Sequence, residues 1–408
     1  MAYNRKQRLN DNIKAIETAF ILDREQRTPT ARERLLLERY CGFGGLKCIL
    51  NPARELADAV HWAKSDLELF APTVELHRLI RENSKNESEY KQLMDSLKQS
   101  VLTAFYTPSA VTEALTDVLK EHQIIPEKVL EPSAGIGAFV DSVLDNNPKA
   151  DIMAFEKDLL TGKILRHLHP EQKVRIEGFE KIEKPFNDYF DLAISNIPFG
   201  DVAVFDPSYT AMKGMRALVT RRIHNYFFVK ALDTVRDGGL VAFITSQGVL
   251  NAKNNSAARF MMLYHADLVS AIRLPNNLFT ENANTEVGSD LIILQKNSQK
   301  ESLRGDDNLL DTVYNDENRI PTNNYFLEHP ERIIHTTAKL DTDPFGKPAM
   351  IYTHEDGVEG IAEYLRKMLH EDFKKNLNLN RYLGIEDRKS EEVKEVEETE
   401  KIEETEKL

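Results

Sequence analysis

Apolar residues recur at helical spacing in two stretches before residue 101. In residues 4–40 they fall three and four positions apart in a charged background, and the break at Thr28-Pro29-Thr30 is typical of a helix start. Residues 53–100 repeat this spacing and are rich in Leu, Glu and Lys. The glycine-rich stretch CGFGGL (41–46) separates the two. Residues 1–100 are therefore predicted to form a helical N-terminal region.

From residue 101 to 297, short apolar runs with many β-branched residues alternate with stretches of helical spacing. The predicted strands are 128–131, 152–155, 174–177, 191–195, 240–245, 268–274 and 290–295. The predicted helices are 109–121, 137–145, 158–168, 223–236 and 255–264. Such alternation is typical of a parallel sheet covered by helices on both faces. We therefore predict an α/β domain over 101–297 with a seven-stranded, mostly parallel sheet.

The end of the chain departs from this alternation. The last two predicted strands are joined by about fifteen residues, which is too short for a typical crossover helix, so we expect an antiparallel pair at one edge. Residues 298–345 are polar and irregular, and 351–384 return to helical spacing. We predict a mixed C-terminal extension over 298–387 and a disordered acidic tail over 388–408.

The net charge of −13 argues against a globally basic nucleic-acid binder. The charge is uneven, because residues 391–408 contain nine Glu and three Lys and so carry six of the negative charges. Any contact with nucleic acid must therefore use local patches of the remaining chain.

The composition does not favour a membrane protein or a metal site. No segment approaches the roughly 18 apolar residues of a membrane helix, and the first residues lack the apolar centre of a signal peptide. We expect a cytoplasmic protein with no membrane partner. Cys41 and Cys48 are the two cysteines, without a second Cys or His set at ligand spacing. Two reduced thiols are expected rather than a zinc site or a disulfide.

The stretch VLEPSAGIGAFV (129–140) places glycines between a predicted strand and a helix. Glycines there let a ligand approach the backbone and leave the helix N-terminus free to face it. The next strand ends near Glu156, 19 residues after Gly137, where a carboxylate can accept hydrogen bonds from both hydroxyls of a ribose. The pattern indicates a cofactor with a ribose. A tight turn at Gly135 and Gly137 with a helix cap at Glu156 is the alternative.

The stretch AISNIPFGD (193–201) follows the fourth predicted strand, so Asn196 shares the carboxyl edge of the sheet with Gly135 and Glu156. The side-chain oxygen of Asn196 and the carbonyl of Pro198 are two acceptors, which suit one exocyclic NH₂ group. Phe199 can stack on a flat ring. The alternative is a turn with Phe199 in the core.

Six motifs occur in the order FYTP (105–108), LEPSAGIGAF (130–139), AFEKD (154–158), NIPF (196–199), GGLVAFITS (238–246) and SAIRLPNNLF (270–279). This order resembles the S-adenosylmethionine-dependent N6-adenine DNA methyltransferases, above all type I modification subunits. FGGL (43–46) resembles methylase-like proteins of phages and conjugative elements. The resemblance covers residues 40–297. It implies a class I methyltransferase with a Rossmann-like fold, S-adenosylmethionine as cofactor, and transfer to adenine N6 in DNA after base flipping.

The resemblance also implies residue roles. Asn196 and Pro198 match the acceptors of the adenine amino group, Phe199 the stacking aromatic, and Glu156 the ribose acid. The matches around the methionine part of the cofactor are Tyr106, Thr107, Pro108, Glu131, Ala134, Gly135 and Gly137. Two positions depart from the pattern. Ile197 stands where proline is common, and Phe179 stands where an Asp often holds the cofactor adenine. Phe179 is assigned to stack on that adenine; weaker cofactor binding is the alternative, and Glu180 is a candidate substitute.

A basic cluster follows the NIPF stretch and is predicted to contact DNA phosphates. Its members are Lys213, Arg216, Arg221 and Arg222. A solvated surface loop is the alternative. No target recognition domain is identified, so either the helical N-terminal region reads DNA or a partner does, such as a specificity subunit or a helicase.

Two other functions stay open. One is a catalytically silent methylase-like module, which binds DNA or restriction machinery as an antirestriction protein of a mobile element. The other is a methyltransferase of an RNA base or a protein glutamine. FYTP and the helical N-terminal region favour DNA methylation, whereas Phe179 and the missing recognition domain favour the silent module.

Overall fold

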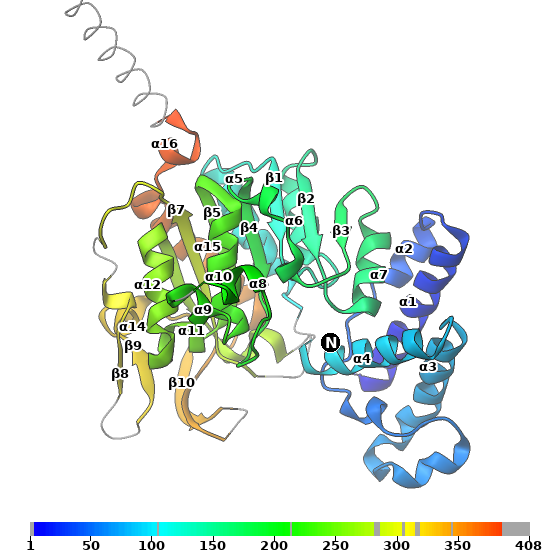
Figure 1. Ribbon diagram of the computed structural model, residues 1–408. Helices are drawn as coiled ribbons and strands as arrows, with labels where there is room; N and C mark the ends of the chain where they lie inside the picture. Colours follow the sequence, from blue (N-terminus) through cyan, green and yellow to red (C-terminus); the bar gives the residue numbers. More distant parts are fainter. Residues whose placement is uncertain are drawn as a thin grey trace, which may run out of the picture.

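A seven-stranded sheet forms the centre of the computed structural model, with strands in the order β3-β2-β1-β4-β5-β7-β6 (Figure 1). The first five pair in parallel, whereas β7 runs antiparallel to both β5 and β6. The predicted α/β fold and its antiparallel edge are confirmed. The strands are β1 (Lys128–Glu131), β2 (Asp151–Phe155), β3 (Lys173–Arg175), β4 (Phe190–Asn196), β5 (Val235–Ser246), β6 (Ala266–Leu274) and β7 (Ser289–Lys296). The structure describes residues 4–103, 106–212, 214–280, 286–303, 307–314, 319–343 and 346–385.

Helices cover both faces of the sheet (Figure 1). The core on one face includes Leu115, Phe139 and Leu365 from α5, α6 and α15, and the core on the other includes Phe228 and Met262 from α10 and α12. These helices are α5 (Ser109–Glu121), α6 (Ala138–Asn146), α7 (Leu159–Leu168), α10 (Ile223–Thr234), α12 (Ser256–His265) and α15 (Gly357–Asn376).

The fifth strand begins earlier than predicted. The helix expected over 223–236 ends at Thr234, and Val235 instead pairs with Phe190 of β4 across a register shift. Gly238 adopts φ +73°, a left-handed conformation that glycine reaches without strain, so the chain bends within the strand rather than continuing the helix.

The N-terminal region is helical and packs beside the sheet domain (Figure 1). Its helices are α1 (Arg5–Glu25), α2 (Ala31–Leu37), α3 (Phe70–Glu82) and α4 (Glu87–Thr103). The predicted start after Thr28-Pro29 is a capping box, in which Thr30 and Glu33 bond each other's backbone N–H groups. A short 3₁₀ helix spans Lys47–Leu50, and two more, at Leu56–His61 and Lys64–Leu69, form the first part of the stretch predicted to be helical from residue 53. The core of the region also includes Leu160, Ile164 and Leu168 of α7.

The C-terminal extension contains strands where the polar sequence predicted irregular chain. β10 pairs antiparallel with β11, so residues 351–353 are extended rather than helical, and the predicted helix begins at Gly357. Its elements are β8 (Thr312–Tyr314), β9 (Pro321–Asn323), α14 (Asn324–Glu328), β10 (Thr337–Thr342), β11 (Pro348–Thr353) and α16 (Leu379–Tyr382). The acidic tail lies outside the described residues. Short helices elsewhere are α8 (Pro207–Thr210), α9 (Met215–Val219) and α11 (Gly248–Asn251).

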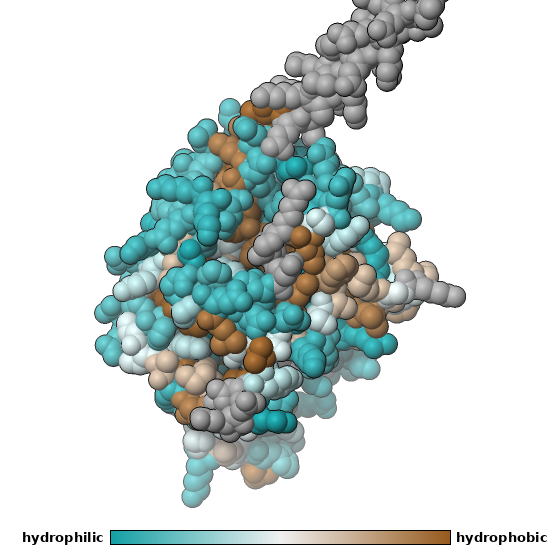
Figure 2. All heavy atoms as spheres, turned by 90° about the vertical axis from the view of Figure 1, so that its left-hand side faces the viewer, coloured by the Kyte–Doolittle hydropathy of each residue, from teal (hydrophilic) through white to brown (hydrophobic). Residues whose placement is uncertain are grey.

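The face toward α12 and α14 is mainly hydrophilic (Figure 2). Short stretches of hydrophobic side chains interrupt it, rather than one continuous apolar area. Single exposed apolar side chains of this kind, such as Leu327 of α14, are normal on protein surfaces. Within the described part of the chain, no helix combines the length and the apolar character needed to span a membrane.

Candidate active site at the carboxyl edge of the sheet

Three predicted motifs meet where β1, β2 and β4 end, because parallel strands share one carboxyl edge. The Ser195 hydroxyl at the end of β4 donates to the carbonyl of Ser133 in the glycine loop at 3.1 Å. On the other side of that loop, the backbone N–H of Gly135 donates to Oε2 of Glu156 at 2.8 Å. The glycine loop is thus bonded both to the strand that carries Asn196 and to the predicted ribose acid.

The glycine loop needs glycine at both positions. Gly135 and Gly137 have φ of +57° and +93°, which L side chains adopt only with strain. A Cβ on Gly135 would also lie 2.8 Å from the ring of Tyr106, and one on Gly137 would overlap the imidazole of His169. The predicted glycines therefore set both the backbone turn and the close approach of two rings.

We expect Gly137→Ala to lower the free energy of unfolding by about 2–4 kcal/mol, from backbone strain plus overlap with His169. Gly384→Ala is the control, because Gly384 also has a positive φ, of +66°, with nothing within 4 Å of its Cβ position. That control should lose only about 1 kcal/mol. Urea denaturation of both variants measures the difference, and equal losses would contradict the steric explanation.

Two carboxyl groups flank the loop with unmet hydrogen-bonding capacity. Glu156 accepts from Gly135 and, at 2.7 Å, from the backbone N–H of Asp158, and burial with the nearby Asp158 carboxylate raises its pKa to about 8. Glu131 is 2% exposed and its Oε2 has no hydrogen-bond partner. Burial raises the pKa of Glu131 well above its usual range. A ligand with hydroxyl donors and a cationic amino group fits this pair.

Asn196 is the last residue of β4, and its side chain is partly exposed at the edge. The next residue, Ile197, is 1% exposed, and its N–H donates to the carbonyl of Ile244 at 2.9 Å. Ile197 belongs to the core beneath the loop, which explains why an apolar residue is accommodated there. Pro198 and Phe199 are partly exposed, and the Phe199 ring lies edge-on to Phe279 at 6.4 Å.

The FYTP segment leads into α5. Tyr106 lies against Gly135, Thr107 is buried, and the carbonyl of Pro108 accepts from Val111 in the first turn of the helix. Ala134 is also buried, with its N–H bonded to the carbonyl of Phe155. These predicted residues therefore gather around the glycine loop.

Phe179 is not brought to this exposed edge. It is 1% exposed in an aromatic cluster with Phe155, Tyr226 and Phe227, at ring distances of 5.2–6.4 Å. This packing gives the ring a place in the core, and its contact with a cofactor stays a prediction. Glu180 folds back over Gly178, 3.5 Å from the ammonium of Lys157.

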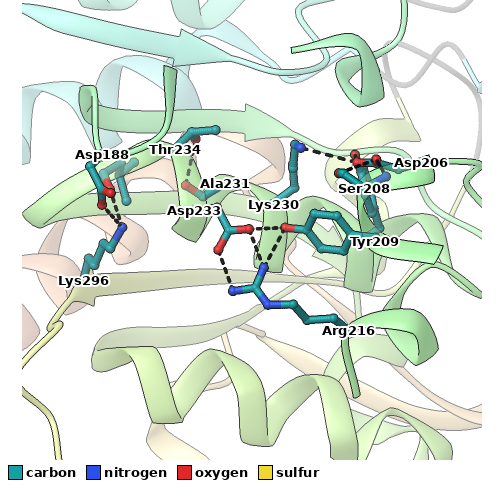
Figure 3. A network of polar contacts seen from close by, with 12 residues as sticks. Asp188, Asp206, Ser208, Tyr209, Arg216, Lys230, Ala231, Asp233, Thr234 and Lys296 are labelled. Carbon is teal, nitrogen blue, oxygen red and sulfur yellow. Dashed lines mark hydrogen bonds and ion pairs between the residues drawn. The ribbon is translucent and has the colours of Figure 1, made fainter. Parts of the chain in front are cut away.

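The predicted basic cluster does not form one cationic surface. Arg216 makes a bidentate ion pair with Asp233 of α10, at 2.6 and 2.9 Å (Figure 3). Arg222 pairs with Asp201 at 2.9 Å and bonds Asn255 at 2.7 Å. Arg221 is exposed, and Lys213 lies outside the described residues. Contact of these residues with DNA stays a prediction, and Arg216 and Arg222 have structural partners.

Polar contacts of two carboxylates, Asp206 in the segment after the NIPF stretch and Asp233 on α10, attach that segment to α10 (Figure 3). Asp206 accepts from the Tyr226 hydroxyl at 2.7 Å and from the Lys230 ammonium at 3.3 Å. Asp233 accepts from the Tyr209 hydroxyl as well as from Arg216. The segment after the NIPF stretch is therefore an anchored part of the fold.

Arg216→Gln is expected to reduce the free energy of unfolding by about 1–3 kcal/mol, because it leaves the half-buried Asp233 without its charged donor. Arg221→Gln serves as the control, since an exposed substitution should change stability by no more than about 0.5 kcal/mol. Guanidinium denaturation compares them. An Arg216 variant as stable as the control would show that the ion pair does not anchor the segment.

Some residues at this site carried no sequence signal of their own. Ser133 and Ser195 join two motifs, and Tyr40 and Thr161 bond each other beside Tyr106. Ser133 lies within the glycine motif, and Ser195 and Tyr40 directly precede the NIPF and CGFGGL stretches, which was the available signal; Thr161 had none. No group of three or more His, Cys, Asp or Glu side chains is arranged to hold a metal ion among the described residues. Cys41 and Cys48 are free thiols.

Comparison with known families gives one match over most of the chain. The model of the N-6 DNA methylase family matches residues 88–391. Defense against restriction protein B of Escherichia phage P1 is 29% identical over 201 residues, which are 48% of this chain and 8% of the phage protein. Type II methyltransferase M.XamI of Xanthomonas campestris pv. amaranthicola is 25% identical over 173 residues, 39% of this chain and 33% of that enzyme. The chain thus corresponds to less than two thirds of either relative.

Solved structures to which this chain shows similarity include two from restriction-modification systems. A type I methyltransferase subunit from Streptococcus thermophilus is 12% identical, with a TM-score of 0.41 over 92% of this chain and 94% of that one. The ATP-dependent type ISP enzyme LlaBIII, bound to DNA, is 13% identical, with a TM-score of 0.40 over 91% of this chain and 28% of that one.

Proposed function

The chain belongs to the N-6 DNA methylase family, and from this premise we propose that it transfers a methyl group from S-adenosylmethionine to N6 of adenine in DNA. The observation that carries the proposal is the bonded arrangement at the sheet edge. The glycine loop is linked on one side to Glu156 and on the other to the strand that ends in Asn196. The proposed cofactor site and the proposed amide acceptor, the side chain of Asn196, therefore share the carboxyl edge of the sheet.

The cofactor would be held by residues with matching chemistry. Each oxygen of the Glu156 carboxylate already accepts one backbone N–H and retains a lone pair for a ribose hydroxyl. The unpartnered Oε2 of Glu131 suits the cationic amino group of the methionine part, and that charge would favour the ionised form of Glu131. When bound, S-adenosylmethionine supplies an electrophilic methyl group on a sulfonium.

The target amine would be oriented by the NIPF stretch. The Asn196 side-chain oxygen and the Pro198 carbonyl accept its two N–H groups, which directs the nitrogen lone pair, while Phe199 stacks on the base. Rate enhancement then comes mainly from holding the two reactants in line. The adenine must first leave the duplex stack, at a cost of a few kcal/mol. Arg221, exposed after the same stretch, is proposed to contact a phosphate.

A partner that reads DNA sequence is part of this proposal. The sequence identifies no target recognition domain, and the family match runs through the sheet domain and its C-terminal extension. We propose a separate specificity subunit or helicase as the partner.

A second candidate function has its own support. The similarity to an antirestriction protein of phage P1 and the burial of Phe179 both favour a methylase-like module without activity. Such a module would bind DNA or restriction machinery for a mobile element.

The test is transfer of label from S-adenosylmethionine to DNA, RNA or protein, followed by digestion of the product. Label in N6-methyladenine from DNA supports the proposal. Label in RNA or in glutamine would replace DNA as the substrate. If calorimetry detects no binding of S-adenosylmethionine and no substrate is labelled, only the silent module is left.

A further inference from the structure

We propose that Tyr40, in the helical N-terminal region, is a positioning residue for the cofactor. Through Thr161 it fixes the ring of Tyr106 over the glycine loop, so that the helical region completes the cofactor site. Tyr40 lies outside the residues matched by the family model, which begin at 88. The inference rests on the proposed binding of S-adenosylmethionine and adds a contribution from a different part of the chain.

The loop directly after Tyr40 is fixed by its glycines and by hydrogen bonds to α1. Gly42 and Gly45 have φ of +67° and +77°, so the C-G-F-G-G-L stretch requires glycine at these two positions. The fully buried Asn12 of α1 donates to the carbonyl of Gly42 at 2.6 Å and accepts from the N–H of Cys41 at 2.9 Å. These bonds tie the loop to α1 directly after Tyr40.

A chain of hydroxyl groups connects this loop to the cofactor edge. Tyr40 is 1% exposed, and its hydroxyl lies 3.1 Å from Oγ1 of Thr161 on α7. The Tyr106 hydroxyl lies 3.5 Å from the same Oγ1. Thr161 is itself fixed, because its N–H donates to the Asp158 carboxylate at 2.7 Å. The rings of Tyr40 and Tyr106 are 6.5 Å apart, so the two tyrosines also pack together.

The position of Tyr106 indicates which end of the cofactor it faces. The sheet order β2-β1-β4 puts the loop after β1 between Glu156, which follows β2, and Asn196, which ends β4. If the ribose is held at Glu156, as proposed, the methyl group would have to face Asn196. The amino-acid part of the cofactor would then lie near Gly135, which the Tyr106 ring contacts.

Tyr40→Phe removes one hydroxyl and keeps the ring that packs edge-on to Phe43 at 6.1 Å. The variant loses the buried hydrogen bond between Tyr40 and Thr161, and Thr161 in turn bonds Tyr106. This loss should weaken binding of S-adenosylmethionine about three- to tenfold. Adenosine lacks the amino-acid chain, so its Kd should change less than about twofold, within the tenths of a kcal/mol expected for an uncoupled site. The difference between the two ligands is the signature of positioning.

The experiment measures both Kd values by calorimetry on the full chain, for wild type, Tyr40→Phe and Thr161→Val. Tyr209→Phe is the control, since Tyr209 is also a buried tyrosine and its hydroxyl bonds Asp233 of α10 rather than a group beside the glycine loop. We expect selective weakening for both Tyr40→Phe and Thr161→Val, no added effect when they are combined, and none for the control.

Three results would overturn the inference. Equal weakening of both ligands would indicate general loss of structure, and unchanged Kd values would show that Tyr106 needs no support. If wild type binds neither ligand, the proposed function fails and the inference with it. Should Tyr40→Phe fold poorly, the ratio of the two Kd values in Thr161→Val decides alone.

Discussion

Asn196→Ala should lower the rate of methyl transfer to adenine by about 10²–10³-fold, the usual loss when one preorganised polar contact to the reacting group is removed. The side-chain oxygen of Asn196 is the proposed acceptor of one amine N–H, and alanine has no equivalent atom. Its backbone position is set by pairing of β4 with Ile244 of β5, so the truncation should leave the strand intact. The Kd of S-adenosylmethionine should change less than about twofold, because the loss concerns the other substrate.

Single-turnover transfer of labelled methyl groups to a duplex measures this effect. Asn147→Ala is the matched control, because Asn147 caps the end of α6 and bonds the carbonyl of Pro126, away from the carboxyl edge. It should lose stability and keep its rate constant. A normal rate in the Asn196 variant would remove that residue from the reaction, whereas a parallel loss in both variants would indicate damage to the fold.

The second large effect is expected at Glu156. Glu156→Gln should weaken S-adenosylmethionine binding about 10–100-fold, because it replaces a charged acceptor of the ribose hydroxyls by a neutral one. In the free protein the pKa of Glu156 is raised to about 8, so the carboxyl is largely protonated at pH 7. Affinity of the wild type should therefore rise from pH 6 to pH 8 and level off above it, and Glu156→Gln should lack this rise.

The same pKa fixes the sign of a stability effect without ligand. A carboxyl group whose folded pKa is raised from 4.5 to about 8 binds more protons in the folded state than in the unfolded state. Its favourable contribution to folding stability is therefore full below pH 4.5 and is lost as the pH rises toward 8.

Calorimetric titrations of S-adenosylmethionine from pH 6 to pH 8 test the predicted rise in affinity. Glu183→Gln is the control, because the ion pair with Arg175 lowers the pKa of Glu183. A pH-independent wild-type Kd would contradict the assignment.

Apolar runs predicted the sheet well because its strands are buried and therefore nearly continuous in apolar residues. The fifteen-residue connection before β7 was sufficient to predict the antiparallel edge. β10 and β11 escaped prediction because β10 is exposed along its length, and its pairing with β11 leaves little apolar pattern. The boundary between α10 and β5 depended on Phe190, a strand partner distant in sequence.

The sequence predicted those parts of the candidate site that lie at the ends of strands. Gly135 and Glu156 follow β1 and β2, and Asn196 ends β4, so their convergence required only the strand order. Phe179 and Arg216 were different, because their surroundings come from residues far along the chain. Two of the three aromatic rings around Phe179, those of Tyr226 and Phe227, lie on α10, and so does the carboxylate that binds Arg216. Periodicity carries no information about such partners.

The sharing of core residues between the helical N-terminal region and α7 has a consequence for synthesis on the ribosome. The N-terminal helices are translated before α7, which contributes three apolar side chains to their core, Leu160, Ile164 and Leu168. Domains commonly fold as they are completed during translation. Here the core of the N-terminal helices cannot be completed until β1, α6, β2 and α7 have also been synthesised, so the folding of this region depends on the synthesis of part of the sheet domain.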